Sequence, residues 1–397
     1  MINMTNAGMT SNLRLNMPEI SLITATEVMT KPRTGQSAAH LPSLDLLRGV
    51  SAFAVAIPHF FLLSGIPFAG AETLAVIAVE VFFVLSGFVL APQILLVLQG
   101  EHRNGLRTFL VRRWMRTVPS YVLALLLVSV LFGEIGSADS VRYLLYVQNL
   151  FAQHNRNDYF PIAWSLSVEE WFYVLFPAVM LVTARVAGLR RSVHWAAVAV
   201  VFIATVTVGR AYLPDLSEWG ANVRRVTIFR IDSIAYGFLL YLALRKLPRQ
   251  TPLTATLPLF LLAAATIFVD LRVIYNADSA AAKAAFPLLA ALFGLAAILL
   301  SLSFRKFSPA ARRVSTFLAT ISYAVYLYHL IVLQLVNAVM ADESTVVRFG
   351  LYSSAVILVA ALISFGIEQP ILAARPRYLR VGPDVSECPP DAPTGPA

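Results

Sequence analysis

Apolar stretches of about 20 residues recur from about residue 44 to about residue 372, separated by short polar segments. A helix of about 20 apolar residues crosses a hydrocarbon core of roughly 30 Å, because each residue adds about 1.5 Å. The pattern predicts ten spans, near residues 44–66, 74–98, 115–134, 166–186, 194–213, 226–246, 254–272, 284–302, 316–340 and 346–371. We therefore predict an all-α integral membrane protein, a bundle of about ten transmembrane helices.

The composition agrees with this prediction. The chain is 58% hydrophobic and 13% charged, whereas a soluble domain has roughly 45–50% apolar and about 25% charged residues. We predict one transmembrane domain, residues 43–372, between a disordered N-terminal tail, residues 1–42, and a disordered Pro-rich tail, residues 373–397. The single cysteine, Cys388, lies in the C-terminal tail. It excludes an intramolecular disulfide and a Cys-based metal site, and we expect no bound metal.

The distribution of charge predicts the topology. The net charge is +9, but the basic residues are scattered between apolar runs, which is typical of topology determinants and argues against nucleic-acid binding. With a cytoplasmic N-terminus, most of the 31 Lys and Arg lie on the cytoplasmic side, so both termini are predicted to be cytoplasmic. Four arginines on the outer side oppose this rule: Arg210, Arg224, Arg225 and Arg230.

Ionisable side chains within apolar segments are candidates for function, because charge in lipid is unfavourable. The first span carries Arg48 and His59. They are eleven residues apart, close to three helical turns, so they share a face about 16 Å apart. Pro58 lacks an amide donor and is expected to kink the helix beside His59. His59 is the candidate reactive group; the alternative is a histidine that is hydrogen-bonded quietly within the bundle.

Two further segments carry candidates. Glu80 in the second span either reacts or pairs with an outer arginine, whereas Ser86 and Gly87 indicate close helix packing. Arg113 and Arg116, in the predicted inner loop before the third span, share a helical face at i, i+3. Paired guanidiniums suit phosphate groups. The alternative is a topology signal in contact with lipid headgroups.

The fourth span contains two adjacent carboxylates. Ser167 and Glu170 have the spacing of a capping box, which predicts a helix start there. Glu169 is expected on a different face, at the outer membrane edge. Other candidates for an acceptor site or a supporting role are Arg230, Asp232, Tyr323 and His329. The residues expected to collect in the outer half are His59, Glu80, Glu169, Arg230 and Asp232. This arrangement suggests a donor that enters from the cytoplasm and an acceptor met further out.

Several segments, read in order, resemble the membrane-bound acyltransferase 3 family, which includes O-acetyltransferases of surface polysaccharides. They are LDLLRGVSAFAVAIPHF, VEVFFVLSGFVL, RRWMRTVP, WSLSVEEWFY, RIDSIAYG, ISYAVYLYH and IEQP, spanning about residues 44 to 370. The resemblance implies an acyltransferase 3 domain over residues 43–372 and a multi-pass protein of the bacterial plasma (inner) membrane. Two positions depart from the family: Ala78 stands where many relatives have Gly, and Pro58 directly precedes the histidine.

The resemblance also implies roles. The donor would be acyl-CoA, most simply acetyl-CoA, with no bound cofactor. The predicted donor site consists of Arg48, Arg113 and Arg116. The predicted catalytic residues are His59, Glu169 and Glu80, with either carboxylate orienting the imidazole. The acceptor would be a hydroxyl of a carbohydrate or glycolipid, such as a cell-surface or exported polysaccharide. The other expected partner is membrane lipid, and no nucleic acid is expected.

Alternatives stay open at the level of sequence. The acyl group either passes directly to the acceptor or first forms a covalent intermediate on His59. A rival reading is a proton-coupled transporter or flippase of a glycan or small solute, in which the buried His and carboxylates relay protons. A receptor without catalysis is a third reading. The sequence identifies neither the acyl group, the acceptor nor the oligomeric state.

Overall fold

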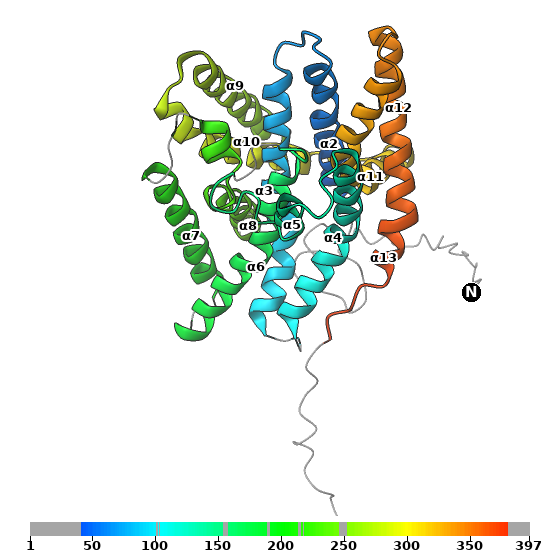
Figure 1. The fold of residues 1–397 in the computed structure, drawn as a ribbon. Coiled ribbons are helices and arrows are strands. Elements are labelled where there is room, and N and C mark those ends of the chain that lie inside the picture. The colour runs from blue at the N-terminus through cyan, green and yellow to red at the C-terminus, as the bar shows by residue number, and fades with distance from the viewer. Residues whose placement is uncertain are drawn as a thin grey trace, which may run out of the picture. The chain divides into compact units, whose positions relative to one another are not determined.

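The computed structural model describes residues 41–100, 102, 104–153, 158–188, 191–212, 216, 218–245 and 252–379. These residues form helices and connecting turns, with no strand among them (Figure 1). Ten of their helical segments are long and apolar enough to cross a membrane. The predicted all-α fold with ten spans is therefore confirmed.

The first five spanning helices are α2 (Pro42–Leu63), α3 (Ala71–Gln99), α4 (Gly105–Leu131), α6 (Ala163–Val186) and α7 (Ser192–Tyr212). A short helix, α5 (Ala138–Leu144), lies between α4 and α6. The sixth span combines η2 (Thr227–Phe229) with α8 (Asp232–Leu244), after a π-helical turn, η1 (Gly220–Arg224). The last four spans are α9 (Leu253–Ala277), α10 (Ala280–Ser303), α11 (Pro309–Val339) and α12 (Thr345–Ile363), which continues through η3 (Ser364–Glu368) into α13 (Gln369–Ala373).

Two helices begin at least seven residues before the predicted spans. The third span was predicted from residue 115, but α4 begins at Gly105. The ninth was predicted from residue 316, but α11 begins at Pro309, where the Ser308 hydroxyl accepts a hydrogen bond from the Ala311 amide. Hydropathy marks the apolar part of a helix, whereas the helix itself continues past it. The arginines predicted to lie in a loop before the third span therefore lie within α4.

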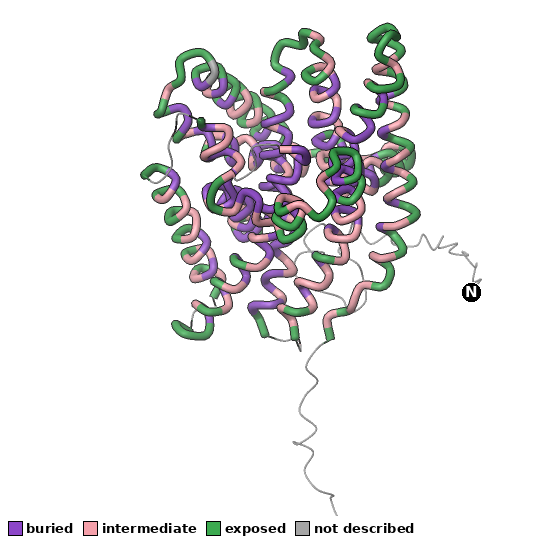
Figure 2. The backbone as a smooth tube through the Cα atoms, viewed as in Figure 1, coloured by how far each residue is buried: buried purple, intermediate pink, exposed green. Residues whose placement is uncertain are grey.

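Helix α3 is the most enclosed of the ten spans. In its most apolar window 78% of the residues are buried, against 11% for α7 and 17% for the α12–α13 span. It packs against α2, α8 and α10, and also contacts α4 and α6. Figure 2 shows the buried residues concentrated in the middle of the bundle and the exposed ones on its periphery. Side chains on α3 therefore meet protein on every side, and its polar residues need partners from other helices.

Glycines allow α3 and α8 to approach closely. A Cβ added at Gly87 would lie 1.8 Å from the Ile234 carbonyl oxygen, and one added at Gly237 would lie 1.9 Å from the Val84 carbonyl oxygen. Any side chain at either position would force the helices apart. The predicted packing role of Gly87 is thus confirmed, and it follows the small-residue rule for helix contacts in membranes.

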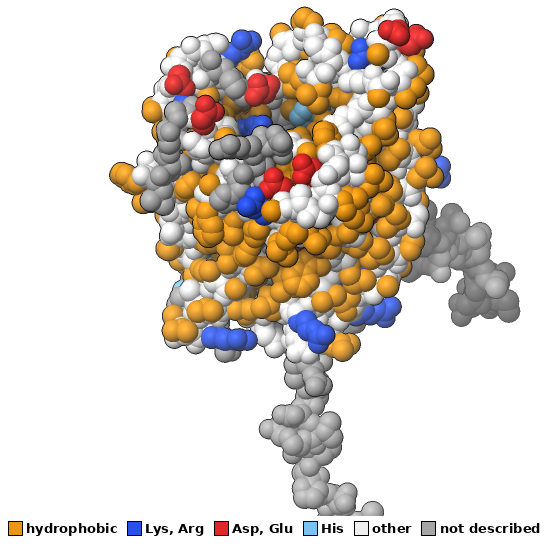
Figure 3. Space-filling model, viewed as in Figure 1, with side chains coloured by type: hydrophobic (Ala, Val, Ile, Leu, Met, Phe, Trp, Pro, Cys, Tyr) orange, Lys and Arg blue, Asp and Glu red, His pale blue; other side chains and the backbone are white. Residues whose placement is uncertain are grey.

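The two ends of the bundle differ in charge. Figure 3 shows an apolar belt between an upper end with acidic and basic side chains and a lower end where basic ones gather. The cytoplasmic location of both termini stays a prediction. Of the two predicted tails, residues 1–40 and 380–397, with Cys388, lie outside the described residues. Residues 374–379 are described, and the Pro376 carbonyl accepts a hydrogen bond from Arg112.

Candidate functional site

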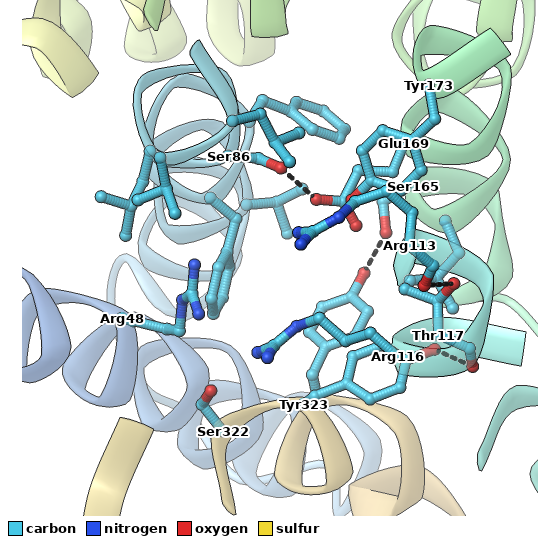
Figure 4. A pocket seen from close by; sticks show the side chains of 18 residues that line it. Arg48, Ser86, Arg113, Arg116, Thr117, Ser165, Glu169, Tyr173, Ser322 and Tyr323 are labelled. Carbon is cyan, nitrogen blue, oxygen red and sulfur yellow. Dashed lines mark hydrogen bonds between the residues drawn. The ribbon is translucent and has the colours of Figure 1, made fainter. Parts of the chain in front are cut away.

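A cavity opens among α2, α3, α4, α6 and α11, and we call it the arginine cavity. Arg48 reaches it from α2, Arg113 and Arg116 from α4, and Glu169 from α6. Figure 4 shows the three guanidiniums converging on one space. The hydroxyls that line it belong to Ser86, Thr117, Ser165, Tyr173, Ser322, Tyr323 and Tyr326. The predicted donor residues therefore lie together.

The charges of the arginine cavity are not balanced within it. The Arg113 guanidinium donates to Gln93 Oε1 at 2.9 Å. Arg48 and Arg116 make neither a hydrogen bond nor an ion pair with any residue that the structure describes. Glu169 is the carboxylate among the described lining residues, and it accepts a hydrogen bond from Ser86 Oγ at 2.6 Å. Three cations against one carboxylate suit an anionic ligand with several oxygens.

The placement of Glu169 corrects the sequence prediction. It was expected at the outer edge beside His59, but it lines the arginine cavity, and no hydrogen bond joins it to His59 among the described residues. The reason is that α6 begins at Ala163, so Glu169 lies two turns inside the helix. Its side chain projects towards α3 and α4 from within the bundle.

The predicted capping box is also wrong. Ser167 and Glu170 lie within α6, and Ser167 Oγ donates to the Ala163 carbonyl at 3.3 Å instead of capping a helix start. Ser and Thr hydroxyls within a helix commonly bond back in this way. Glu170 is buried and accepts a hydrogen bond from Thr117 Oγ1 of α4 at 2.5 Å. It joins α6 to α4 beside the cavity.

His59 and His329 form a pair, which we call the histidine pair. His59 Nδ1 and His329 Nε2 are 3.1 Å apart, and the two rings lie 5.0 Å apart between centroids at 27°. His329 is fully buried on α11, whereas His59 on α2 is partly exposed. The sequence singled out both residues but did not place them together. They are 270 positions apart in the chain.

Backbone carbonyls fix the tautomers of the histidine pair. His329 Nδ1 lies 2.8 Å from the Tyr326 carbonyl and 3.2 Å from the Val325 carbonyl, and a carbonyl only accepts, so this nitrogen carries the proton. Neutral His329 then accepts at Nε2, and His59 must donate from Nδ1. The remaining nitrogen of His59, Nε2, therefore holds a lone pair. This is the form that a general base requires.

Tyr326 connects the histidine pair to the arginine cavity. Its side chain lines the cavity, while its carbonyl holds His329 and its ring centroid lies 6.2 Å from that of His329. Its hydroxyl is 2.6 Å from Ser165 Oγ. Tyr323, one turn earlier on α11, also lines the cavity, and its hydroxyl donates to the Thr117 carbonyl at 2.9 Å. Tyr326 on α11 thus lies at the boundary between the two groups of functional side chains.

Glu80, Arg230 and Asp232 belong to a different arrangement, which we call the ion-pair cluster. Arg230 forms a fully buried ion pair with Glu80. Asp232 is fully buried in a two-point ion pair with Arg210, with both N–O distances 3.0 Å. None of the four lines the arginine cavity. Among the described residues neither Glu80 nor Glu169 makes a hydrogen bond with His59, which contacts His329 instead.

Burial also explains the arginines that opposed the positive-inside rule. Arg210, Arg224 and Arg230 are buried within the protein. The rule concerns charges in loops beside the membrane, so these three do not count towards topology. Arg224 lies 5.5 Å from the ring centroid of Trp164, and Arg225 pairs with Asp158 at 3.2 Å.

Sequence reasoning missed part of the cavity lining. Ser86 was assigned to packing alone, and Ser165, Tyr173 and Tyr326 were not assigned to the donor site. A helical wheel of α6 offers a signal, because Tyr173 lies four residues after Glu169 and shares its face. The described residues hold no group of three or more His, Cys, Asp or Glu that could bind a metal.

The fold and site define a class: a multi-pass membrane protein with a cation-lined cavity and, linked to it through Tyr326, a pair of hydrogen-bonded histidines. The chain belongs to the acyltransferase 3 family, since the family's model, described as an acyltransferase domain, matches residues 41–365. The resemblance read from the sequence is therefore confirmed.

Named relatives cover smaller parts of the chain. A peptidoglycan O-acetyltransferase OatA of Listeria monocytogenes is 32% identical over 168 residues, covering 38% of this chain and 26% of that protein. An O-acetyltransferase OatA of Staphylococcus aureus is 30% identical over 162 residues, covering 36% and 25%. The matched part thus spans about a quarter of each relative's length. No solved structure matches the chain.

Proposed function

We propose that this protein is a membrane O-acyltransferase that moves an acyl group, acetyl in the simplest case, from acyl-CoA to a hydroxyl of a cell-surface glycan. One observation carries the proposal: His59, whose Nε2 lone pair follows from its contact with His329, is linked to the cation-lined cavity through Tyr326, which holds His329 and lines the cavity. The family supports the reaction class, and the names of the relatives favour O-acetylation of a glycan such as peptidoglycan.

The donor is assigned to the arginine cavity. Arg48 and Arg116 make no hydrogen bond or ion pair with a described residue, so phosphate oxygens can accept their hydrogen bonds without displacing protein groups. The apolar lining, which includes Phe82, Phe83 and Leu90, suits the thioester arm. Tyr326 borders both the cavity that would hold that arm and the histidine pair.

The tautomers of the histidine pair determine which nitrogen acts as the base in acyl transfer. His59 Nε2 takes the proton of the acceptor hydroxyl, and the resulting oxygen nucleophile attacks the thioester carbonyl. The new C–O bond forms, the C–S bond breaks, and the thiolate of coenzyme A leaves. The thiolate then takes the proton from His59, which restores the base. General-base catalysis of this kind is worth typically about 10²–10⁴ in rate.

His329 is proposed as a positioning residue. Its Nε2 accepts the His59 Nδ1 proton and holds the ring in one orientation. When His59 becomes cationic, the proton between the two rings can be shared, while the Val325 and Tyr326 carbonyls stabilise the charge on His329. His329 thus orients the His59 ring, a role that the sequence predicted for a carboxylate.

The alternative function, a proton-coupled transporter or flippase, is less well supported. A proton relay needs carboxylates that can change protonation state along a path. Glu80 and Asp232 are instead each paired with an arginine in the protein interior. Proton-driven transport would require a gradient, whereas acyl transfer in detergent would not.

The test is transfer of label from radiolabelled acetyl-CoA to peptidoglycan fragments and other bacterial glycans by the purified full chain in detergent. We expect transfer by the natural chain and a loss of about 10²-fold or more in His59→Ala. His194→Ala, on α7, is the matched control. His329→Gln keeps an acceptor for His59 Nδ1 and should retain more activity than His329→Leu.

Three results bear on this proposal in different ways. Full activity of His59→Ala would exclude the mechanism. Label trapped on the natural chain after quenching, and absent from His59→Ala, would show that the acyl group passes through His59. Solute movement driven by a pH gradient without acetyl-CoA, together with absence of transfer, would favour the transporter.

A further inference from the structure

A groove lies where the segment after α13 meets the beginning of α4, and we call it the tail groove. Its lining includes Asn104, Arg107 and Thr108 from the α4 side and Pro376 and Arg377 from the segment. Figure 1 shows this segment running beside the start of α4 at the lower end of the bundle. No Asp or Glu is among its described lining residues. The groove is thus cationic.

Arg112 attaches this segment to α4. Its Nη1 donates to the Pro376 carbonyl at 2.6 Å, and its guanidinium lies 5.4 Å from the ring centroid of Tyr378. The ring of His102 meets the same tyrosine edge-on, with centroids 5.6 Å apart. An arginine, a tyrosine and a histidine therefore meet beside the groove.

Polar atoms at this meeting point are buried without partners. They are Arg112 Nε, His102 Nδ1 and the Tyr378 hydroxyl. Arg113 Nε, on the next residue of α4, is also buried without a hydrogen-bond partner. Buried polar groups in proteins are nearly always hydrogen-bonded, so several unpartnered ones on neighbouring side chains indicate a polar ligand. Their mixture of donors and acceptors suits a ligand with phosphates and a ring that bears nitrogen atoms.

The electrostatic field joins the tail groove to the arginine cavity. Burial lowers the pKa of the Arg375 guanidinium, and the cations of Arg112 and Arg116 lower it further. Arg113, which lines the cavity, interacts with both Arg375 and Tyr378. Mutual repulsion among these arginines is relieved when an anion binds between them.

We propose that the tail groove binds the phosphorylated nucleotide end of the acyl donor. The inference rests on the proposed function and adds to it a second subsite. Acyl-CoA consists of a slender thioester arm that ends in one phosphate and a nucleotide that carries two more phosphate groups. The arm enters the arginine cavity, while the nucleotide lies in the tail groove against Arg107 and Arg377, with Arg112 and Arg375 beside it. The segment after α13 thus belongs to the donor site.

Phosphate could also come from a lipid headgroup, since the groove lies at one end of the membrane-spanning bundle. The position of the groove favours the nucleotide, because its charges continue into the cavity proposed for the arm of the same molecule. Tyr378 and His102 supply aromatic surface that a headgroup phosphate does not use. The two sources are separated by varying lipid and donor independently.

The experiment compares two donors that share the thioester arm: acetyl-CoA, and acetyl-4′-phosphopantetheine, which lacks the nucleotide. The full chain in neutral-lipid nanodiscs is assayed as the natural sequence, as Arg375→Gln with Arg377→Gln, and as Tyr378→Leu. Arg312→Gln with Arg313→Gln, exposed residues at the beginning of α11, is the matched control. Thermal stabilisation by coenzyme A and by phosphopantetheine gives a readout independent of turnover.

We expect the double arginine variant to raise KM for acetyl-CoA about tenfold or more while KM for acetyl-phosphopantetheine stays unchanged. Stabilisation by coenzyme A should fall in parallel. Equal changes for both donors, or none for either, would overturn the inference while leaving the proposed function intact. So would variants that respond to added anionic lipid and not to the nucleotide. A natural chain that neither transfers from nor is stabilised by acetyl-CoA would overturn the proposed function as well.

Discussion

The ion-pair cluster and the arginine cavity both place arginines within the bundle, and both use α3. In the ion-pair cluster each arginine meets one carboxylate, the side chains are almost fully buried, and the glycine-mediated contact of α3 with α8 lies nearby. In the arginine cavity three arginines face one carboxylate around open space. Arginine therefore serves two purposes in this protein. In the ion-pair cluster each arginine is balanced by a carboxylate, whereas in the arginine cavity the arginines outnumber the carboxylate.

A buried pair is held by its partner, and removing one member leaves an uncompensated charge. An unpartnered arginine beside a cavity is tolerated because water or a ligand reaches it. The comparison predicts that substitutions in the ion-pair cluster lower stability and that substitutions in the arginine cavity lower affinity for the donor. Each of the following changes tests one side of that division.

The largest effect on stability is expected for Arg230→Met. It leaves the Glu80 carboxylate buried without its partner, which should lower the free energy of unfolding by about 3–5 kcal/mol. Thermal unfolding in detergent measures the change. The double variant Glu80→Gln with Arg230→Met should recover most of the loss, because no charge stays unpaired.

Arg225→Met is the matched control, since Arg225 pairs with Asp158 near the surface, where its side chain is 34% exposed. An exposed pair of this kind contributes about 0–1 kcal/mol. If Arg230→Met unfolded at the same temperature as Arg225→Met, the ion-pair cluster would not be a structural element.

The sequence predicted the helices better than their partners, for a physical reason. Hydropathy and helix length are local properties, so the ten spans could be read directly. Contacts between helices join distant positions: His59 with His329, and Ser86 with Glu169, which are 83 positions apart. Nothing in the local pattern determines which of two neighbouring glutamates faces the cavity.

The same limit explains the open choice at Glu80 and the error at Glu170. Both were recognised as polar residues within apolar segments, but the sequence left Glu80 between reaction and ion pairing, and the structure shows the ion pair. Glu170 matched a capping pattern whose spacing also occurs within helices, where α6 places it against Thr117. The three arginines predicted for the donor site do lie together around one cavity, and their binding of a donor stays a prediction.

Arg48→Gln, in the arginine cavity, is expected to have an intermediate effect, which falls on the affinity for the donor. Arg48 has no hydrogen bond or ion pair with a described residue and lies near Arg116, so its removal should leave the unfolding temperature unchanged or slightly higher. The lost charge-assisted hydrogen bonds to the donor correspond to about 1.5–3 kcal/mol, a rise in KM for acetyl-CoA of about 10- to 100-fold.

Arg312→Gln, exposed at the beginning of α11, controls for loss of a positive charge at no specific site. The comparison fails if Arg48→Gln unfolds as readily as Arg230→Met, because Arg48 would then be structural. If Arg48→Gln keeps the unfolding temperature of the natural chain and raises KM for acetyl-CoA, the arginine cavity serves binding and the ion-pair cluster serves stability.

The smallest effect is expected for Ser86→Ala, which tests how α3 serves the cavity. Ser86 Oγ donates to Glu169 at 2.6 Å, but that carboxylate faces open space, so water can replace the hydroxyl. The expected loss is about 1 kcal/mol, or about fivefold in kcat/KM. Ser322→Ala is the control, because Ser322 also lines the cavity but donates to the Ala319 carbonyl. Equal activity of the two variants would mean that Glu169 keeps its position without the hydrogen bond from Ser86 on α3. A selective loss in Ser86→Ala would show that the enclosed helix orients the carboxylate of the cavity as well as holding the ion-pair cluster.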